Sequence, residues 1–173
     1  ILINTYRIRN HLPPLRLSPM LTRSAQAMTN DMAEREWNPP PEKSAHCQVS
    51  PKPEDCGSIY WHQDSKRRLP LQRNSAQGYT DTTHGENLLA GYVSAEEAFE
   101  GWRTSPGHNA NMLHDTFCSI GIARTYNPNS KVFGRTGAFW ATDFGGQRDQ
   151  DILPRVLPGG AILVDTIGPR RPD

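Results

Sequence analysis

Apolar side chains recur every three or four residues over positions 19–36, which predicts an amphipathic helix. Ser18 and Pro19 form a helix-start signal, because serine caps the first turn and proline fits the first helical position. The prolines at 39–41 end the helical pattern. The apolar face of this helix consists of Leu21, Ala25, Met28 and Met32.

Start and stop signals predict further helices on both sides of this one. A short helix over residues 2–12 ends before Pro13, and another over 69–79 is terminated by Gly78. The segment between them, residues 38–66, is rich in proline and polar residues and is expected to be irregular.

Two helices are predicted in close succession in the middle of the chain. Ser94 and Glu97 form a capping box, in which each side chain satisfies a free backbone N–H at the helix start. Ser105 and Pro106 begin a second, shorter helix that carries His108 in its first turn.

The pattern then changes from helical spacing to alternation, which indicates β-strands. Residues 119–126 (SIGIARTY) and 137–144 (GAFWATDF) are predicted to form antiparallel strands joined by a polar loop that contains NPNS. Residues 159–167 (GGAILVDTI) are expected to form a further strand. Because helices come first and strands follow, the chain is predicted to be an α+β domain.

Composition narrows the class of protein further. At 173 residues the chain has the length of one domain, and its formal charge of +1 provides no basic surface for nucleic acid. The longest apolar runs, LLAGYV and AILV, are too short to cross a bilayer. No signal-peptide pattern opens the chain, so we expect Ile1 to follow a processed end or a truncation.

The three cysteines do not decide between an oxidising and a reducing compartment. Cys47 and Cys56 bracket a proline-rich loop. A disulfide between them would stabilise the fold by about 2–3 kcal/mol, because it restricts the unfolded chain. This interpretation favours an oxidising compartment. The alternative is two free thiols in a reducing compartment. Cys118 precedes an apolar stretch and is predicted to be a buried small hydrophobic residue rather than a nucleophile.

The sequence contains none of the common enzyme signatures. H-E-x-x-H, G-x-S-x-G, the P-loop and G-x-G-x-x-G are all absent. His84 and Glu86 spell the H-x-E of zinc deaminases, but the required P-C-x-x-C does not follow.

Two polar residues remain as candidates for chemistry. Glu86 is expected in a turn between Gly85, which allows close approach of another segment, and Asn87, which can hold the turn. His108 is expected to be neutral, because a helix N-terminus disfavours imidazolium. The alternative for Glu86 is that it accepts backbone hydrogen bonds and only fixes the loop.

Six segments occur in an order that resembles one known family. They are ILINTYRIRNHLPPLRLSPMLTRSAQAMTNDMA, WHQDS, HGENLLAGY, GWRTSPGHNANML, CSIGIA and WATDFGG. The chain is similar over about residues 2–146 to the CAP superfamily, named for cysteine-rich secretory proteins, antigen 5 and pathogenesis-related protein 1, and most of all to its compact bacterial branch. The resemblance implies a three-layer α-β-α sandwich with a central antiparallel sheet, and secretion. It also implies a CAP domain over residues 1–146 and a C-terminal extension over 147–173.

The family resemblance also implies a site. Many members line a central cleft with two histidines and two glutamates, which in some cases hold a divalent metal such as zinc. The matching positions here are His62, Glu86 and His108, while the second glutamate is replaced by Ser105, which we expect to cap its helix. Two imidazoles and one carboxylate can still form a three-ligand metal site.

The remaining histidines are assigned no role in the site. His84, just before the HGEN glutamate, could compensate for the missing ligand, but a solvent-facing histidine is the simpler interpretation. His46 and His114 receive the same interpretation.

Three hypotheses for function follow. The first is a secreted, monomeric, non-catalytic module whose cleft binds a divalent metal or a small apolar, lipid or peptide-like ligand. The second is a metal-assisted or serine-type peptidase, with Glu86, Ser105 and His108 as the candidate catalytic residues. The third is an extracellular interaction module without a bound ligand, in which residues 38–58 form the recognition surface.

Overall fold

The computed structural model describes residues 1–35, 61–132 and 135–149. Its elements, in chain order, are α1 (Leu2–Arg9), β1 (Arg16–Leu17), α2 (Pro19–Glu34), α5 (Pro70–Ala76), β2 (His84–Ala90), α6 (Ala95–Thr104), α7 (Pro106–Met112), β3 (Ser119–Val132) and β4 (Arg135–Gly145). The predicted helices and the β3–β4 hairpin are confirmed, but the NPNS segment predicted as a loop lies within β3, where the register shifts between Asn127 and Lys131. The expected strand at 159–167 and the pair Cys47 and Cys56 lie outside the described residues.

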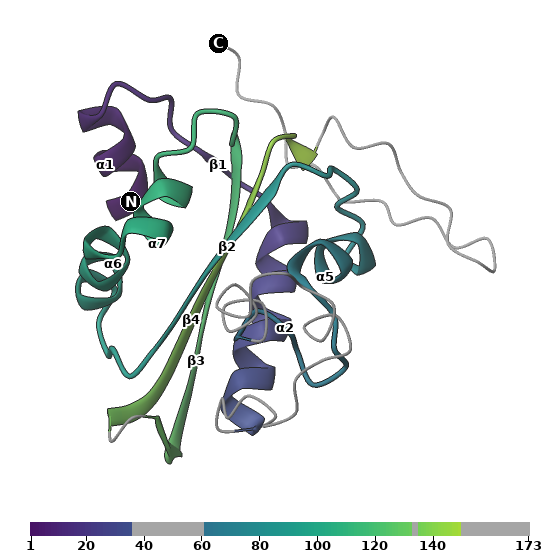
Figure 1. Ribbon diagram of the computed structural model, residues 1–173, viewed down its shortest axis with the longest axis vertical. Coiled ribbons are helices and arrows are strands. Elements are labelled where there is room, and N and C mark those ends of the chain that lie inside the picture. The colour runs from purple at the N-terminus through teal and green to yellow at the C-terminus, as the bar shows by residue number, and fades with distance from the viewer. Residues whose placement is uncertain (36–60, 133–134, 150–173) are drawn as a thin grey trace, which may run out of the picture.

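The described strands form one sheet in the order β1-β3-β4-β2. β3 and β4 pair antiparallel, as do β4 and β2, whereas the two-residue β1 runs parallel to β3. Helices α2 and α5 cover one face of the sheet, and α1, α6 and α7 cover the other, as Figure 1 shows. This arrangement confirms the α+β class and the three-layer sandwich.

The core is divided by the sheet into two apolar clusters. On the α2 face, Met28 and Met32 pack against Leu88 and Phe139. On the opposite face, residues of α1, α6 and α7, including the buried Trp102, pack against Trp140 and Phe144. Each strand of the hairpin therefore contributes alternate side chains to the two clusters.

Local capping signals determine where two of the helices begin. The Ser18 side chain accepts a hydrogen bond from the backbone N–H of Leu21, which starts α2 and ends β1 after only two residues. The capping box of Ser94 and Glu97 forms as predicted at the start of α6.

Helix α2 packs unusually close to β3 because of a glycine. A Cβ atom on Gly121 would lie 2.1 Å from the backbone carbon of Leu21, a distance that no side chain tolerates. Glycine at this position thus sets the spacing between the helix and the sheet.

Candidate functional site

Glu86 lies in the middle of β2, the edge strand of the sheet, opposite Asp143 of β4. Its side chain is 1% exposed. The turn that was predicted around Glu86 is wrong, because the segment pairs with β4 over its whole length. Helices cover both faces of β2, so its polar and apolar residues do not alternate and the strand signal is weak.

Two side chains occupy the two carboxylate oxygens of Glu86. His62 Nδ1 lies 2.7 Å from Oε1, and the guanidinium of Arg73 in α5 donates to Oε2. Arg73 Nη1 also donates to the carbonyl oxygens of His62, at 2.8 Å, and of Arg68, at 2.7 Å. One buried guanidinium therefore holds both the carboxylate and the backbone of the histidine that contacts it.

These contacts keep Glu86 ionised. Burial alone would raise the pKa of this carboxyl, but the Arg73 charge and the His62 hydrogen bond outweigh burial, so the pKa lies below its ordinary value. A carboxylate only accepts hydrogen bonds, so His62 Nδ1 is the donor. In the neutral imidazole, Nε2 is then left as an acceptor.

Asp143 is a second buried carboxyl that the sequence analysis did not identify. Its oxygens are near Ser24 and Glu86, but neither oxygen makes a well-formed hydrogen bond within the described residues. Burial, together with the negative charge of Glu86, raises the pKa of Asp143 well above its ordinary value. Glu86 therefore carries the negative charge of this pair, while Asp143 favours the protonated form.

We expect Asp143→Asn to change how stability depends on pH. Because the pKa of Asp143 is raised in the folded state, its stabilising contribution is complete below the unfolded value near 3.8 and is lost as pH rises toward the folded value. Asparagine resembles the protonated acid and does not titrate. In urea unfolding between about pH 4 and pH 8, the variant should therefore gain free energy of unfolding relative to wild type as pH rises. Parallel curves would contradict the assignment.

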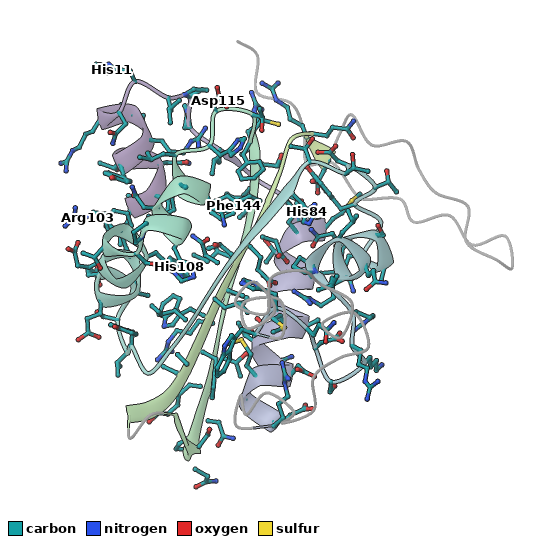
Figure 2. All side chains as sticks on the ribbon, in the orientation of Figure 1. His11, His84, Arg103, His108, Asp115 and Phe144 are labelled. Atoms are coloured by element: carbon teal, nitrogen blue, oxygen red, sulfur yellow. The ribbon has the colours of Figure 1, made fainter. Side chains whose placement is uncertain are left out.

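Helix α7, which carries His108, is held against β2 by a network of amides. Asn111 Nδ2 donates to the backbone oxygen of Glu86, at 3.1 Å, and to Asn87 Oδ1, at 2.9 Å. Asn87 Nδ2 in turn donates to the backbone oxygen of His108, at 3.0 Å. These bonds attach α7 to the outer edge of β2, so Asn87 holds a helix rather than a turn. Figure 2 shows His108 between α7 and the sheet.

The imidazole of His108 favours the neutral form, as expected, but for a different reason. Burial lowers the pKa of His108, and the nearby His62 lowers it further. Desolvation, rather than the helix terminus, is thus the main cause. Within the described part of the chain, the buried Nδ1 of His108 has no hydrogen-bond partner.

Ser105 stands at the N-cap of α7, but its hydroxyl accepts no capping hydrogen bond. The expected capping role of this side chain is therefore not observed. The described residues also show no hydrogen bond between Ser105 and either imidazole, so they provide no activated serine.

The arrangement does not favour Glu86 as a metal ligand. Among residues 1–35, 61–132 and 135–149, no group of three or more His, Cys, Asp or Glu side chains is placed to hold a metal ion. Both oxygens of Glu86 are engaged, and the fixed positive charge of Arg73 would repel a divalent cation. Metal binding by His62, Glu86 and His108 remains a prediction.

A cavity of about 540 Å³ lies away from these residues, beside α6. Tyr92, Glu96 and Glu100 are among its lining residues, and none of the predicted site residues is.

The other candidate residues that the structure describes lie outside the site. The side chain of His84 lies at the exposed start of β2, where Nδ1 is 2.9 Å from the backbone oxygen of Thr82, and that of His114 is 48% exposed. Cys118 is a free thiol and half-buried, less buried than predicted. His46 lies outside the described residues.

Arg73 is the second residue that the sequence analysis missed. It occurs in a polar helix, LPLQRNSAQ, where an arginine normally faces solvent. The sequence offers 19 lysines and arginines, including Lys66, Arg67 and Arg68 close by, so it does not single out Arg73 as the partner of Glu86. Its position in space depends on α5 packing against α2 and β2, which local pattern does not reveal.

Within the described ranges, no helix has the length and hydropathy needed to span a bilayer.

Comparison with curated proteins identifies two uncharacterised relatives in Bacillus subtilis. YkwD is 25% identical over 146 residues, which cover 84% of this chain and 45% of YkwD. YlbC, named as a membrane protein, is 28% identical over 92 residues, or 53% of this chain and 26% of YlbC. The chain thus spans less than half the length of these relatives.

Two solved structures share the fold. One is an extracellular protein containing an SCP domain from Bacillus anthracis, with a TM-score of 0.61 and 20% identity over 84% of this chain and 38% of that one. The other is an outer surface protein of Borrelia burgdorferi, with a TM-score of 0.61 and 16% identity over 84% of this chain and 87% of that one. The family model for the cysteine-rich secretory proteins, CAP, matches residues 1–144. The chain belongs to the cysteine-rich secretory protein (CAP) family.

Proposed function

We propose that the chain is a secreted, non-catalytic binding domain in which His62 and His108 contact a small peptide-like ligand. An extracellular location is supported by the fold relatives, which are described as an extracellular protein and an outer surface protein. The observation that carries the ligand proposal is that the carboxylate of Glu86 is fully engaged, so its role is to orient His62. The imidazoles are then the groups left for a ligand.

The protonation pattern favours a ligand with neutral hydrogen-bonding groups. His62 Nδ1 donates to Glu86, and in the neutral form of the ring Nε2 can accept from an N–H or O–H group. Burial disfavours the charged form of His108, and its Nδ1 is buried, so Nε2 is the ring nitrogen left to exchange a hydrogen bond with a ligand. Peptide groups carry this combination of donor and acceptor, and a free anion does not. We therefore favour a peptide-like ligand over an apolar one or a metal.

A hydrolase is the second candidate, and one observation favours it. A carboxylate at 2.7 Å from the ring nitrogen of a histidine is the arrangement that orients a general base. Within the described residues, however, neither imidazole is hydrogen-bonded to a hydroxyl or thiol group that could serve as the nucleophile. A water molecule would have to take that role.

The proposed function can be tested by titrating ¹⁵N-histidine-labelled protein with blocked tripeptides, acetylated and amidated at their ends. We expect saturable shifts of the His62 and His108 ring signals, and at least tenfold weaker binding, about 1.4 kcal/mol, in His62→Ala and His108→Ala. His84→Ala is the matched control, because its imidazole is exposed on the same strand as Glu86.

Other outcomes of this titration separate the alternatives. Tripeptide binding that is unchanged in both alanine variants would contradict the proposal. Cleavage of the tripeptides that is lost in His62→Ala would indicate the hydrolase instead. Ring shifts caused by Zn²⁺ and reversed by EDTA would support the predicted metal site.

A further inference from the structure

Among the described residues, the outer edge of β3 is unpaired beyond the end of β1. β1 pairs with β3 only at Ser119 and Ile120, because Ser18 caps α2 and directs the chain away from the sheet. β3 continues to Val132. Beyond Ile120, the described residues contribute no strand to this edge.

The backbone groups on this edge can be identified from one hydrogen bond. Within β3, the backbone oxygen of Ile120 accepts from the N–H of Ser18, the residue after β1, at 2.9 Å, so even-numbered residues of β3 direct their polar groups away from β4. Because N–H and C=O groups alternate between the two sides of a strand, Ile122, Arg124 and Tyr126 present theirs outward. None of the described residues bonds to these outward groups.

The open edge has a defined length. β1 bounds one end at Ile120, and Pro128 bounds the other, because proline has no N–H to offer. A β-bulge follows between Asn127 and Lys131. The usable edge is therefore the five-residue segment 122–126, which we call the β3 edge.

The side chains along the β3 edge alternate apolar, basic and apolar. Ile122 is 39% exposed and Tyr126 is 50% exposed, on the sheet face opposite α2. Arg124 lies between them, with its guanidinium carbon 5.5 Å from the centre of the Tyr126 ring and 5.4 Å from that of Trp140. These aromatic contacts hold the cation in place beside the open backbone groups.

We propose that the β3 edge is a docking site for an extended segment of a partner protein, which adds a strand to the sheet. Three outward N–H groups and three outward C=O groups supply the backbone bonds of such β-augmentation. Charge and apolar complementarity require an acidic residue opposite Arg124 and apolar residues two positions to either side. The partner motif is therefore apolar-x-acidic-x-apolar.

A second copy of this chain is a poorer occupant of the β3 edge. Two antiparallel copies that use all three outward residues must be centred on Arg124. That register places Arg124 directly opposite its own equivalent, and like charges in that position destabilise a strand pair. The acidic partner segment avoids this repulsion.

The proposal can be tested with the peptide acetyl-Thr-Val-Thr-Glu-Thr-Val-Thr-amide and the full chain. Hydrogen exchange should show fast amides at 122, 124 and 126 in the free protein, slow amides at 121, 123 and 125, and protection of the fast set when the peptide binds. Protection of 122, 124 and 126 in the free protein would overturn the proposal, because the edge would already be covered.

Two variants separate backbone pairing from other modes of binding. Ile122→Pro removes one outward N–H and leaves the ladder to β4 intact, so peptide binding should weaken at least tenfold while the circular dichroism spectrum is retained. Ile122→Thr keeps the N–H and is the matched control. Arg124→Glu should reverse the preference between the glutamate peptide and its lysine counterpart. Equal binding by Ile122→Pro and Ile122→Thr, or equal binding of both peptides to wild type, would overturn the proposal.

Two further outcomes concern the occupant. One version of the peptide is N-methylated on its valines and glutamate, and another on its threonines. Only one of these two sets of N–H groups faces the β3 edge, so one methylated peptide should lose binding and the other should keep it. Equal loss in both sets would contradict strand addition. Dimerisation of the free chain that is lost in Ile122→Pro would overturn the proposal in favour of a second copy.

Discussion

Replacing Arg73 by methionine is expected to lower the free energy of unfolding by about 3–5 kcal/mol, because it leaves the buried carboxylate of Glu86 without its cation. Both side chains of this pair are 1% exposed, so water cannot replace the lost contact. The substitution also removes the donor to the carbonyl oxygens of His62 and Arg68. Urea unfolding measured by circular dichroism would report the change.

The control for this prediction is the exposed pair of Arg103 and Glu100 on α6. Its side chains are 42% and 54% exposed, and Arg103→Met should leave stability nearly unchanged. A double variant, Arg73→Met with Glu86→Gln, should recover part of the lost stability, because no charge is then left buried alone. Equal effects of Arg73→Met and Arg103→Met would show that Glu86 does not depend on Arg73.

Arg7→Met is expected to be the second strongly destabilising change. Arg7 in α1 is fully buried and donates to four carbonyl oxygens, those of Pro13, Met112, His114 and Phe117, at 2.9–3.2 Å. Each carbonyl left unsatisfied in the interior costs about 1–3 kcal/mol. Since methionine retains the apolar part of the side chain, the loss can be assigned to these hydrogen bonds.

The location of these carbonyls determines what Arg7→Met should disturb. Three of the four follow or end α7, so the variant should loosen the segment that connects α7 to β3. Hydrogen exchange should rise there before it rises in α2. Arg9→Met is the control, because Arg9 is exposed on the same helix. A comparable loss of stability in Arg9→Met would contradict the role assigned to Arg7.

The helices were predictable because their boundaries depend on neighbouring residues. Ser18 with Pro19 and Ser94 with Glu97 act locally, and both formed as predicted. β2 was not predicted as a strand, because its segment HGENLLA is covered by helices on both sides and shows no alternation. β1 has only two residues, too few for any periodic signal.

The site was predictable only in part, for a related reason. Glu86 and His108 were named from their local sequence and His62 from the family resemblance, and the structure brings His62 and Glu86 into contact. Arg73 and Asp143 could not be named, because their importance depends on the register of β2 with β4 and on the docking of α5. Such long-range placement leaves no trace in local periodicity.

Glu86 contacts both helical layers of the sandwich at once. Its carboxylate binds Arg73 of α5 on one side, and its backbone oxygen accepts from Asn111 of α7 on the other. Separation of either helical layer from the sheet would therefore disrupt the arrangement of the His62 and His108 imidazoles. A signal from the His62 ring should then disappear at the first sub-global opening of the molecule, and so serve as an early reporter of partial unfolding.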